Sequence, residues 1–129
     1  MGSPINLQRY ILMTITVGLV ACADIPLRKT APPVIPPSVA SLRTISVPRE
    51  QRLPSAAVVR SNTRWQYVGS LPEGDVYRPT NTVLTIEGSH IHEAYLVLKG
   101  KALVGYYLPV EGALSVVEPP VPIETAPAD

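Results

Sequence analysis

The chain has 129 residues, a formal net charge of +1, 15 prolines, one cysteine and no phenylalanine. A near-neutral charge argues against nucleic acid as a partner, because phosphate backbones are bound by strongly basic surfaces. One cysteine excludes a disulfide within the chain, and the length allows at most one domain.

The N-terminal region has the organisation of a secretory signal sequence. Arg9 is the one basic side chain of the polar start, and residues 10–23 are uncharged and mostly apolar. Such a run is too short to cross a bilayer of about 30 Å, but it is typical of the apolar core of a signal peptide. The sequence predicts a signal peptide over residues 1–21.

The end of this run, Leu19-Val20-Ala21-Cys22, resembles the lipobox of bacterial lipoproteins. The resemblance implies that the Cys22 thiol receives a diacylglycerol and that a signal peptidase cleaves between Ala21 and Cys22. A thiolate is the side chain best suited to form a stable thioether, and two or more acyl chains anchor a protein stably. No group other than this covalent lipid is expected as a cofactor.

The residue after the cysteine indicates the destination of the protein. In that family an aspartate directly after the cysteine is the inner-membrane retention signal, and this chain has Ala23 there. The resemblance therefore implies a protein anchored to the outer membrane that faces the periplasm. The alternative is an ordinary signal peptide, or a short membrane anchor, with an incidental cysteine.

Prolines dominate both flanks of the remaining chain. Residues 22–62 predict a lipidated cysteine followed by a proline-rich tether, since Pro-Pro pairs favour extended polyproline II at about 3.1 Å per residue. Residues 119–129 predict a proline-rich tail, because proline cannot donate to a strand ladder. Within the tether, residues 54–60 are compatible with a short helix or a strand.

Residues 63–118 predict a small β domain. Residues 82–87 alternate in polarity, with Leu84 and Ile86 on one face. Residues 91–98 and 102–108 form the clearest hairpin, closed through Lys99-Gly100-Lys101. We therefore expect a mainly β fold, a small antiparallel meander that is sandwich- or barrel-like, with a disordered proline-rich N-terminal tether and C-terminal tail.

Both faces of this hairpin are apolar, whereas an antiparallel sheet with one solvent-exposed face has polar side chains on that face. Either the hairpin is the centre of a closed core, or one face binds a partner protein. On the second interpretation, the partner-binding residues are Tyr95, Val97, Val104 and Tyr106.

The sequence contains no recognisable catalytic motif, such as a P-loop or a nucleophile elbow, so we expect a protein that is not an enzyme. His90 and His92 share a strand face and are candidate metal ligands, although no third ligand is identifiable. Trp65, Tyr67 and Tyr77 form either an aromatic platform for glycan or the large side chains of a core without phenylalanine.

The layout resembles that of the small lipoprotein subunits of type IV secretion and conjugation core complexes. In those subunits a lipidated cysteine precedes an extended, proline-containing segment that lies along a larger β-rich partner, and the resemblance covers Cys22 to about Pro54. It implies a non-catalytic structural or adaptor subunit, bound to a larger envelope protein within an oligomeric complex. The competing hypothesis is a periplasmic ligand-binding lipoprotein that uses the histidine pair or the aromatic residues.

Overall fold

A computed structural model describes residues 25–36 and 43–128, so Ala21 and Cys22 lie outside the described residues. All regular elements in the described part are strands, and their pairing is antiparallel, which confirms the predicted fold class. No helix of the described part is long and apolar enough to span a membrane. The strands are β1 (Arg28–Lys29), β2 (Thr44–Val47), β3 (Gln51–Leu53), β4 (Ala57–Val59), β5 (Thr63–Leu71), β6 (Gly74–Pro79), β7 (Thr85–Glu87), β8 (Ile91–Glu93), β9 (Tyr95–Lys99), β10 (Ala102–Leu108), β11 (Ala113–Pro122) and β12 (Ala126–Pro127).

Local sequence patterns explain the central strands. Every second residue of β5 is buried, which is the period of a strand with one face inward. The predicted hairpin is present as β9 and β10, and its turn is formed by Gly100 and Lys101 between the paired residues Lys99 and Ala102. Gly100 has a φ of 63°, a left-handed conformation that glycine adopts without steric cost.

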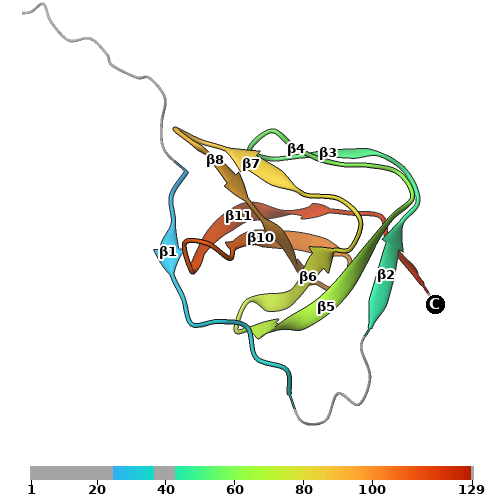
Figure 1. Cartoon of the computed structure of the whole chain (residues 1–129), viewed down its shortest axis with the longest axis horizontal. Coiled ribbons are helices and arrows are strands. Elements are labelled where there is room, and N and C mark those ends of the chain that lie inside the picture. Colours follow the sequence, from blue (N-terminus) through green and yellow to red (C-terminus); the bar gives the residue numbers. More distant parts are fainter. Residues whose placement is uncertain (1–24, 37–42, 129) are drawn as a thin grey trace, which may run out of the picture.

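The C-terminal segment joins the two sides of the main sheet. This sheet has eight strands in the order β1-β11-β10-β9-β6-β5-β2-β12. The backbone N–H of Ile123 donates to the carbonyl of Lys101 at 3.0 Å, and the N–H of Ala128 donates to the carbonyl of Thr44 at 3.1 Å. Because β11 pairs with β10 and β12 pairs with β2, the short connection between them gives the sheet a closed, barrel-like form (Figure 1).

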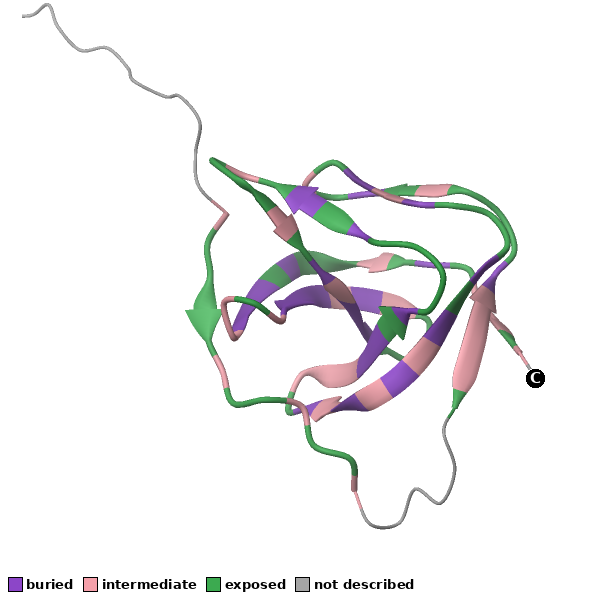
Figure 2. Cartoon of the chain, in the orientation of Figure 1, coloured by how far each residue is buried: buried purple, intermediate pink, exposed green. Residues whose placement is uncertain are grey.

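Consecutive residues of the central strands β9 and β10 are buried (Figure 2), and they belong to two clusters on opposite faces of the sheet. The larger core cluster packs the main sheet against the β3–β4 and β7–β8 hairpins, and Trp65, Tyr67 and Tyr106 are its largest fully buried side chains. A second cluster lies on the other face, with Val97 and Tyr107 among its members. Both apolar faces of the β9–β10 hairpin are therefore covered by this chain's own residues, as the closed-core interpretation predicted.

The segment of residues 25–36 is packed against the domain. Its strand β1 pairs with β11, and Val34 exchanges backbone hydrogen bonds with Ser70 of β5 at 2.8 and 3.0 Å. A Cβ atom on Gly69 would lie 2.8 Å from the Cβ of Pro33, so only glycine permits this close approach. The segment thus runs from β11 to β5, which are separated in the sheet by three other strands.

The predicted boundaries of the β domain, residues 63–118, are wrong at both ends. On the N-terminal side, β2, β3 and β4 lie within the predicted tether, and β2 is a strand of the main sheet. The prolines do not prevent this, because Pro48 follows β2 and Pro54 lies in the turn between β3 and β4. Proline interrupts pairing only where it stands inside a strand, and these prolines stand between short strands.

The predicted tail is likewise part of the fold, because β11 extends to Pro122 and Ile123 is buried. Leu103 lies opposite Val121 while Gly105 lies opposite Val116, so residues 117–120 are outside the ladder with β10. Pro119 and Pro120 lie in this irregular stretch and are exposed. Because they do not pair with β10, their missing backbone N–H groups do not cost the sheet a hydrogen bond. A stretch that the sequence predicted to be a tail therefore closes the sheet.

Replacement of Ile123 tests this closure. The side chain is 3% exposed and packs in the main core, so Ile123→Ala should lower the free energy of unfolding by about 2–5 kcal/mol. The matched change Val116→Ala, at a position on β11 that is 43% exposed, should cost less than about 0.5 kcal/mol. Urea unfolding followed by fluorescence of Trp65, the single tryptophan, measures both, and equal effects would contradict the closing role of this segment.

Candidate functional site

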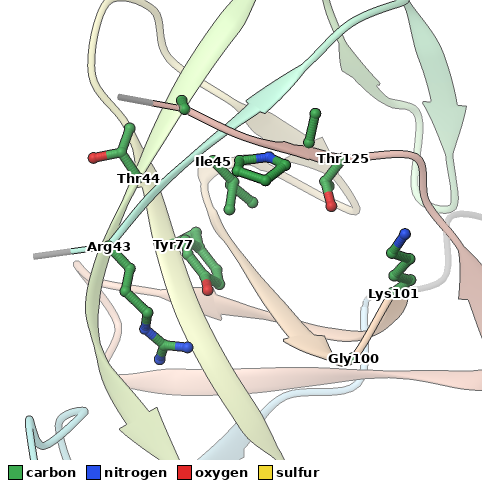
Figure 3. Close-up of a pocket in the computed structure, with 10 residues that line it drawn as sticks. Arg43, Thr44, Ile45, Tyr77, Gly100, Lys101 and Thr125 are labelled. Carbon is green, nitrogen blue, oxygen red and sulfur yellow. The ribbon is translucent and has the colours of Figure 1, made fainter.

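An open pocket with a volume of about 670 Å³ lies where β2, β12 and the β9–β10 turn meet (Figure 3). Residues from four separate parts of the chain line it. They are Arg43, Thr44 and Ile45, then Tyr77, then Gly100 and Lys101, and finally Thr125, Ala126, Pro127 and Ala128. The pocket therefore exists only because the C-terminal segment pairs with β2.

The wall beside Arg43 is an ordered polar network. The guanidinium contacts Asp75 at 3.2 Å and lies 4.2 Å from the ring centroid of Tyr67. The Ser70 hydroxyl donates to Asp75 at 2.8 Å, and the Tyr67 hydroxyl is 2.6 Å from the Ser70 hydroxyl. A cation held between a carboxylate and an aromatic face has a fixed direction while one side stays exposed.

The other polar side chains of the pocket are also donors or cations. Burial raises the pKa of the Tyr77 hydroxyl, against the lowering effect of the Arg43 guanidinium, so this hydroxyl is neutral at pH 7 and can donate a hydrogen bond. Lys101 is exposed on the side of the pocket opposite Arg43 (Figure 3). A guanidinium, an ammonium and a neutral phenol around one cavity suit a ligand with carboxylate or carbonyl oxygens.

This pocket was not predicted from the sequence. Arg43 fell within the predicted tether, and residues 125–128 fell within the predicted tail. The turn at Gly100 and Lys101 was recognised, and Tyr77 was a candidate only for an aromatic platform. No local pattern links Arg43 to Thr125, because their proximity results from pairing between strands about 80 residues apart in the sequence.

The two predicted metal ligands lie at a different place, near the start of the packed chain. His90 and His92 line a smaller groove of about 320 Å³ together with Ile25, Leu27 and Ser89. Nδ1 of His92 is 2.8 Å from Oε2 of Glu111, which gives this ring a partner within the chain. Among residues 25–36 and 43–128, no three His, Cys, Asp or Glu side chains converge as a metal site would require.

The predicted aromatic platform for glycan is wrong. Trp65 and Tyr67 are each 1% exposed, and Tyr77 is 6% exposed, so no flat aromatic surface faces solvent at these residues. The indole N–H of Trp65 donates to the Thr63 hydroxyl at 3.0 Å inside the core. These rings supply the bulk that a core without phenylalanine needs.

The predicted partner-binding face needs two corrections. Tyr95, Val97 and Val104 do lie on one side of the sheet, but Val97 is buried and the other two are half-buried against the second cluster. Tyr106 lies on the opposite side, fully buried in the main core, and its hydroxyl donates to the carbonyl of Pro54 at 2.7 Å. The four residues do not form one open docking surface.

A β-bulge explains the position of Tyr106. Val104 and Gly105 together lie opposite Val97, so one extra residue enters β10 and the alternation shifts by one. Tyr107, instead of Tyr106, then faces Tyr95, with their ring centroids 6.2 Å apart. A glycine inside a strand pattern often marks a bulge, and Gly105 was the available signal.

Comparison with models of protein families, with curated proteins and with solved structures finds no match to this chain.

The buried hydroxyl of Tyr106 predicts a loss of stability at alkaline pH. Burial raises the pKa of this group above its ordinary value of about 10, so the unfolded chain releases the proton first as pH rises. The stabilising contribution is complete below about pH 10 and falls above it. Tyr106→Phe should cost about 0.5–1.5 kcal/mol at pH 7 through the lost hydrogen bond.

Urea unfolding of wild type and Tyr106→Phe at a series of pH values up to the alkaline limit measures this effect. The wild-type free energy of unfolding should fall more steeply above pH 10 than that of the variant. Parallel curves would show that the hydroxyl of Tyr106 titrates alike in the folded and unfolded protein.

Proposed function

We propose that this chain is a lipid-anchored, non-catalytic adaptor of the bacterial cell envelope, bound to the periplasmic face of the outer membrane through acylated Cys22. The lipobox-like sequence Leu19-Val20-Ala21-Cys22 and the alanine at position 23 support the anchor and its destination. A larger envelope protein is the partner, and an envelope-spanning assembly, such as a type IV secretion or conjugation complex, is the setting.

The observation that carries the proposal is the small number of residues between Cys22 in the sequence and the packed domain. Ile25, three residues after Cys22, already contacts the main core and lies against Gly88. Three residues span at most about 10 Å, because an extended chain covers about 3.5 Å per residue. The domain is therefore held at the membrane surface, which suits a protein that fixes the position of a partner there.

This arrangement changes the role of the proline-rich segment. The resemblance to secretion-complex subunits predicts that residues after the cysteine lie along a larger partner. In the described residues, 25–36 and 43–54 instead pair with or pack on this chain's own domain. Partner binding then depends on the surface of the folded domain.

The pocket between β2, β12 and the β9–β10 turn is the proposed partner site. Its two cations, Arg43 and Lys101, and the neutral hydroxyl of Tyr77 favour an acidic segment or a chain terminus of the partner. Charged groups at such a site set the orientation and the rate of association as well as the affinity.

The anchor is tested by the variant Cys22→Ser. Wild-type protein purified from cells should begin at residue 22, carry acyl chains and sediment with the outer membrane. The variant should retain no acyl chain and leave the outer-membrane fraction. A second variant, Ala23→Asp, should keep the lipid and move to the inner membrane. Mass spectrometry that found an unmodified Cys22, or residues 1–21 still attached, would refute the proposal.

The partner site is tested by the double variant Arg43→Gln/Lys101→Gln. Purification of the lipidated protein in detergent, with quantitative mass spectrometry of bound envelope proteins, should recover about tenfold less partner, equivalent to about 1.4 kcal/mol. Arg52→Gln/Arg60→Gln is a matched control, because both arginines are exposed and the change in net charge is the same. An equal loss of partner in both double variants would indicate net charge alone, and no loss in either would place the site elsewhere.

A further inference from the structure

Three elements meet at the end of the domain where the N-terminal segment packs. They are β1, the loop of residues 109–112 between β10 and β11, and the turn between β7 and β8 (Figure 1). The N–H of Thr30 donates to the carbonyl of Gly112 at 3.2 Å, and Nζ of Lys29 donates to the carbonyl of Glu111 at 3.0 Å. We call this region, formed by residues 25–30, 88–90 and 109–112, the anchor end.

Exposed aliphatic side chains gather on the N-terminal segment and next to it. Val110 is 78% exposed at the tip of the loop, and Leu27 is 40% exposed just before β1. Of the seven large hydrophobic side chains that are exposed in the described part, Leu27 and Val110 belong to the anchor end, and Ile91 follows it directly on β8. Val34, with Ile35 beside it in the chain, lies farther away and is bonded to Ser70 of β5. A single exposed aliphatic residue is ordinary, but exposed aliphatic residues on adjacent elements at one end of a domain indicate an interaction surface.

Basic side chains accompany these apolar residues. Arg28 and Lys29 are both exposed on β1, directly after Leu27. Arg28 pairs with Glu73, and Lys29 contacts a carbonyl while its side chain stays at the surface. Aliphatic and basic groups side by side suit the headgroup region of a bilayer, where the former enter the acyl boundary and the latter meet phosphate.

Acidic side chains limit how deeply the anchor end can enter a bilayer. Glu87 and Glu93 are exposed on β7 and β8, and Ile91 lies directly opposite Glu87. Carboxylates are disfavoured in an apolar medium, so the outer face of the β7–β8 hairpin stays in water. Val110 and Leu27 are then the side chains that reach the lipid.

The length of chain before the domain restricts which end can face the membrane. Cys22 is within about 10 Å of Ile25 at full extension, and Ile25 belongs to the anchor end. The β9–β10 turn is at the other end of β10, a strand of seven residues that spans about 23 Å. An acyl chain on Cys22 therefore holds the anchor end at the bilayer and leaves the turn remote from it.

We propose that the anchor end lies on the phospholipid surface, with Val110 and Leu27 inserted at the boundary between headgroups and acyl chains. This inference rests on the proposed lipid anchor and adds an orientation to it. The pocket with Arg43 and Lys101 then faces away from the membrane, toward the periplasmic part of a partner.

Single-cysteine labelling tests this orientation in the full, lipidated protein. Because lipidation consumes the chain's one cysteine, Val110→Cys, Val83→Cys and Lys101→Cys each provide one free thiol. Val83 is the matched control, an exposed valine in the loop between β6 and β7, and Lys101 marks the remote end. Each variant carries an environment-sensitive fluorophore and is reconstituted in vesicles of phosphatidylethanolamine and phosphatidylglycerol with a shallow spin-labelled quencher lipid.

The emission maximum of the label at position 110 should shift to shorter wavelength on vesicle binding. This label should also be quenched several-fold more strongly than the labels at positions 83 and 101. Equal quenching at all three positions, in protein whose acylation is verified by mass spectrometry, would overturn the orientation and leave the anchored function standing. Stronger quenching at position 101 than at position 110 would reverse the orientation. Protein that carries no lipid and does not bind the vesicles would overturn the proposed function itself.

Discussion

The pairing of the C-terminal segment with strands on both sides of the main sheet is the interaction on which the rest of the structure depends. Residues 121–123 bond to β10 and residues 126–128 bond to β2, which brings together parts of the chain about 80 residues apart. Closing such a long loop has an entropic cost in free energy, which is offset by the burial of Ile123 and Val117 in the main core. The same pairing builds one wall of the pocket, so the stability of the fold and the shape of the site share one cause.

Two irregular strands explain how a chain this short buries both faces of its sheet. β10 and β5 each contain an extra residue, and in both the pair at the irregularity is a valine followed by a glycine, at Val104-Gly105 and Val68-Gly69. A bulge bends the strand and increases its twist, which lets a small sheet curve around its core. Gly69 has a second role, since the absence of a side chain leaves room for the N-terminal segment against β5. The second cluster is thereby enclosed without a helix or a disulfide.

Local patterns predicted the central hairpin, but they did not predict which distant strands pair. Alternation identified the buried positions Leu84 and Ile86, and two apolar runs around Gly100 predicted the β9–β10 hairpin. Proline content was misread, because a proline between short strands and a proline in a disordered linker look the same in one sequence. Arg43 could not be placed in a site, since its neighbours Thr125 and Ala126 are brought there only by long-range pairing. Cys22, where the functional proposal begins, lies outside the described residues, and its role is still a prediction from the lipobox-like sequence.

If the chain is the anchored adaptor proposed above, the two ends of its domain have different roles. The proposed lipid on Cys22 would confine the protein to a surface. Only two residues lie between Cys22 and Ile25, the first described residue, so the anchored domain could not search a large volume. A long tether would allow many orientations, whereas a domain held directly at the bilayer presents one end consistently. Because the pocket lies at the other end of β10, the proposed partner would meet its cations at a distance from the membrane that is set by the domain itself. Under the proposed function, such a protein would position its partner at a defined distance from the membrane instead of capturing partners at long range.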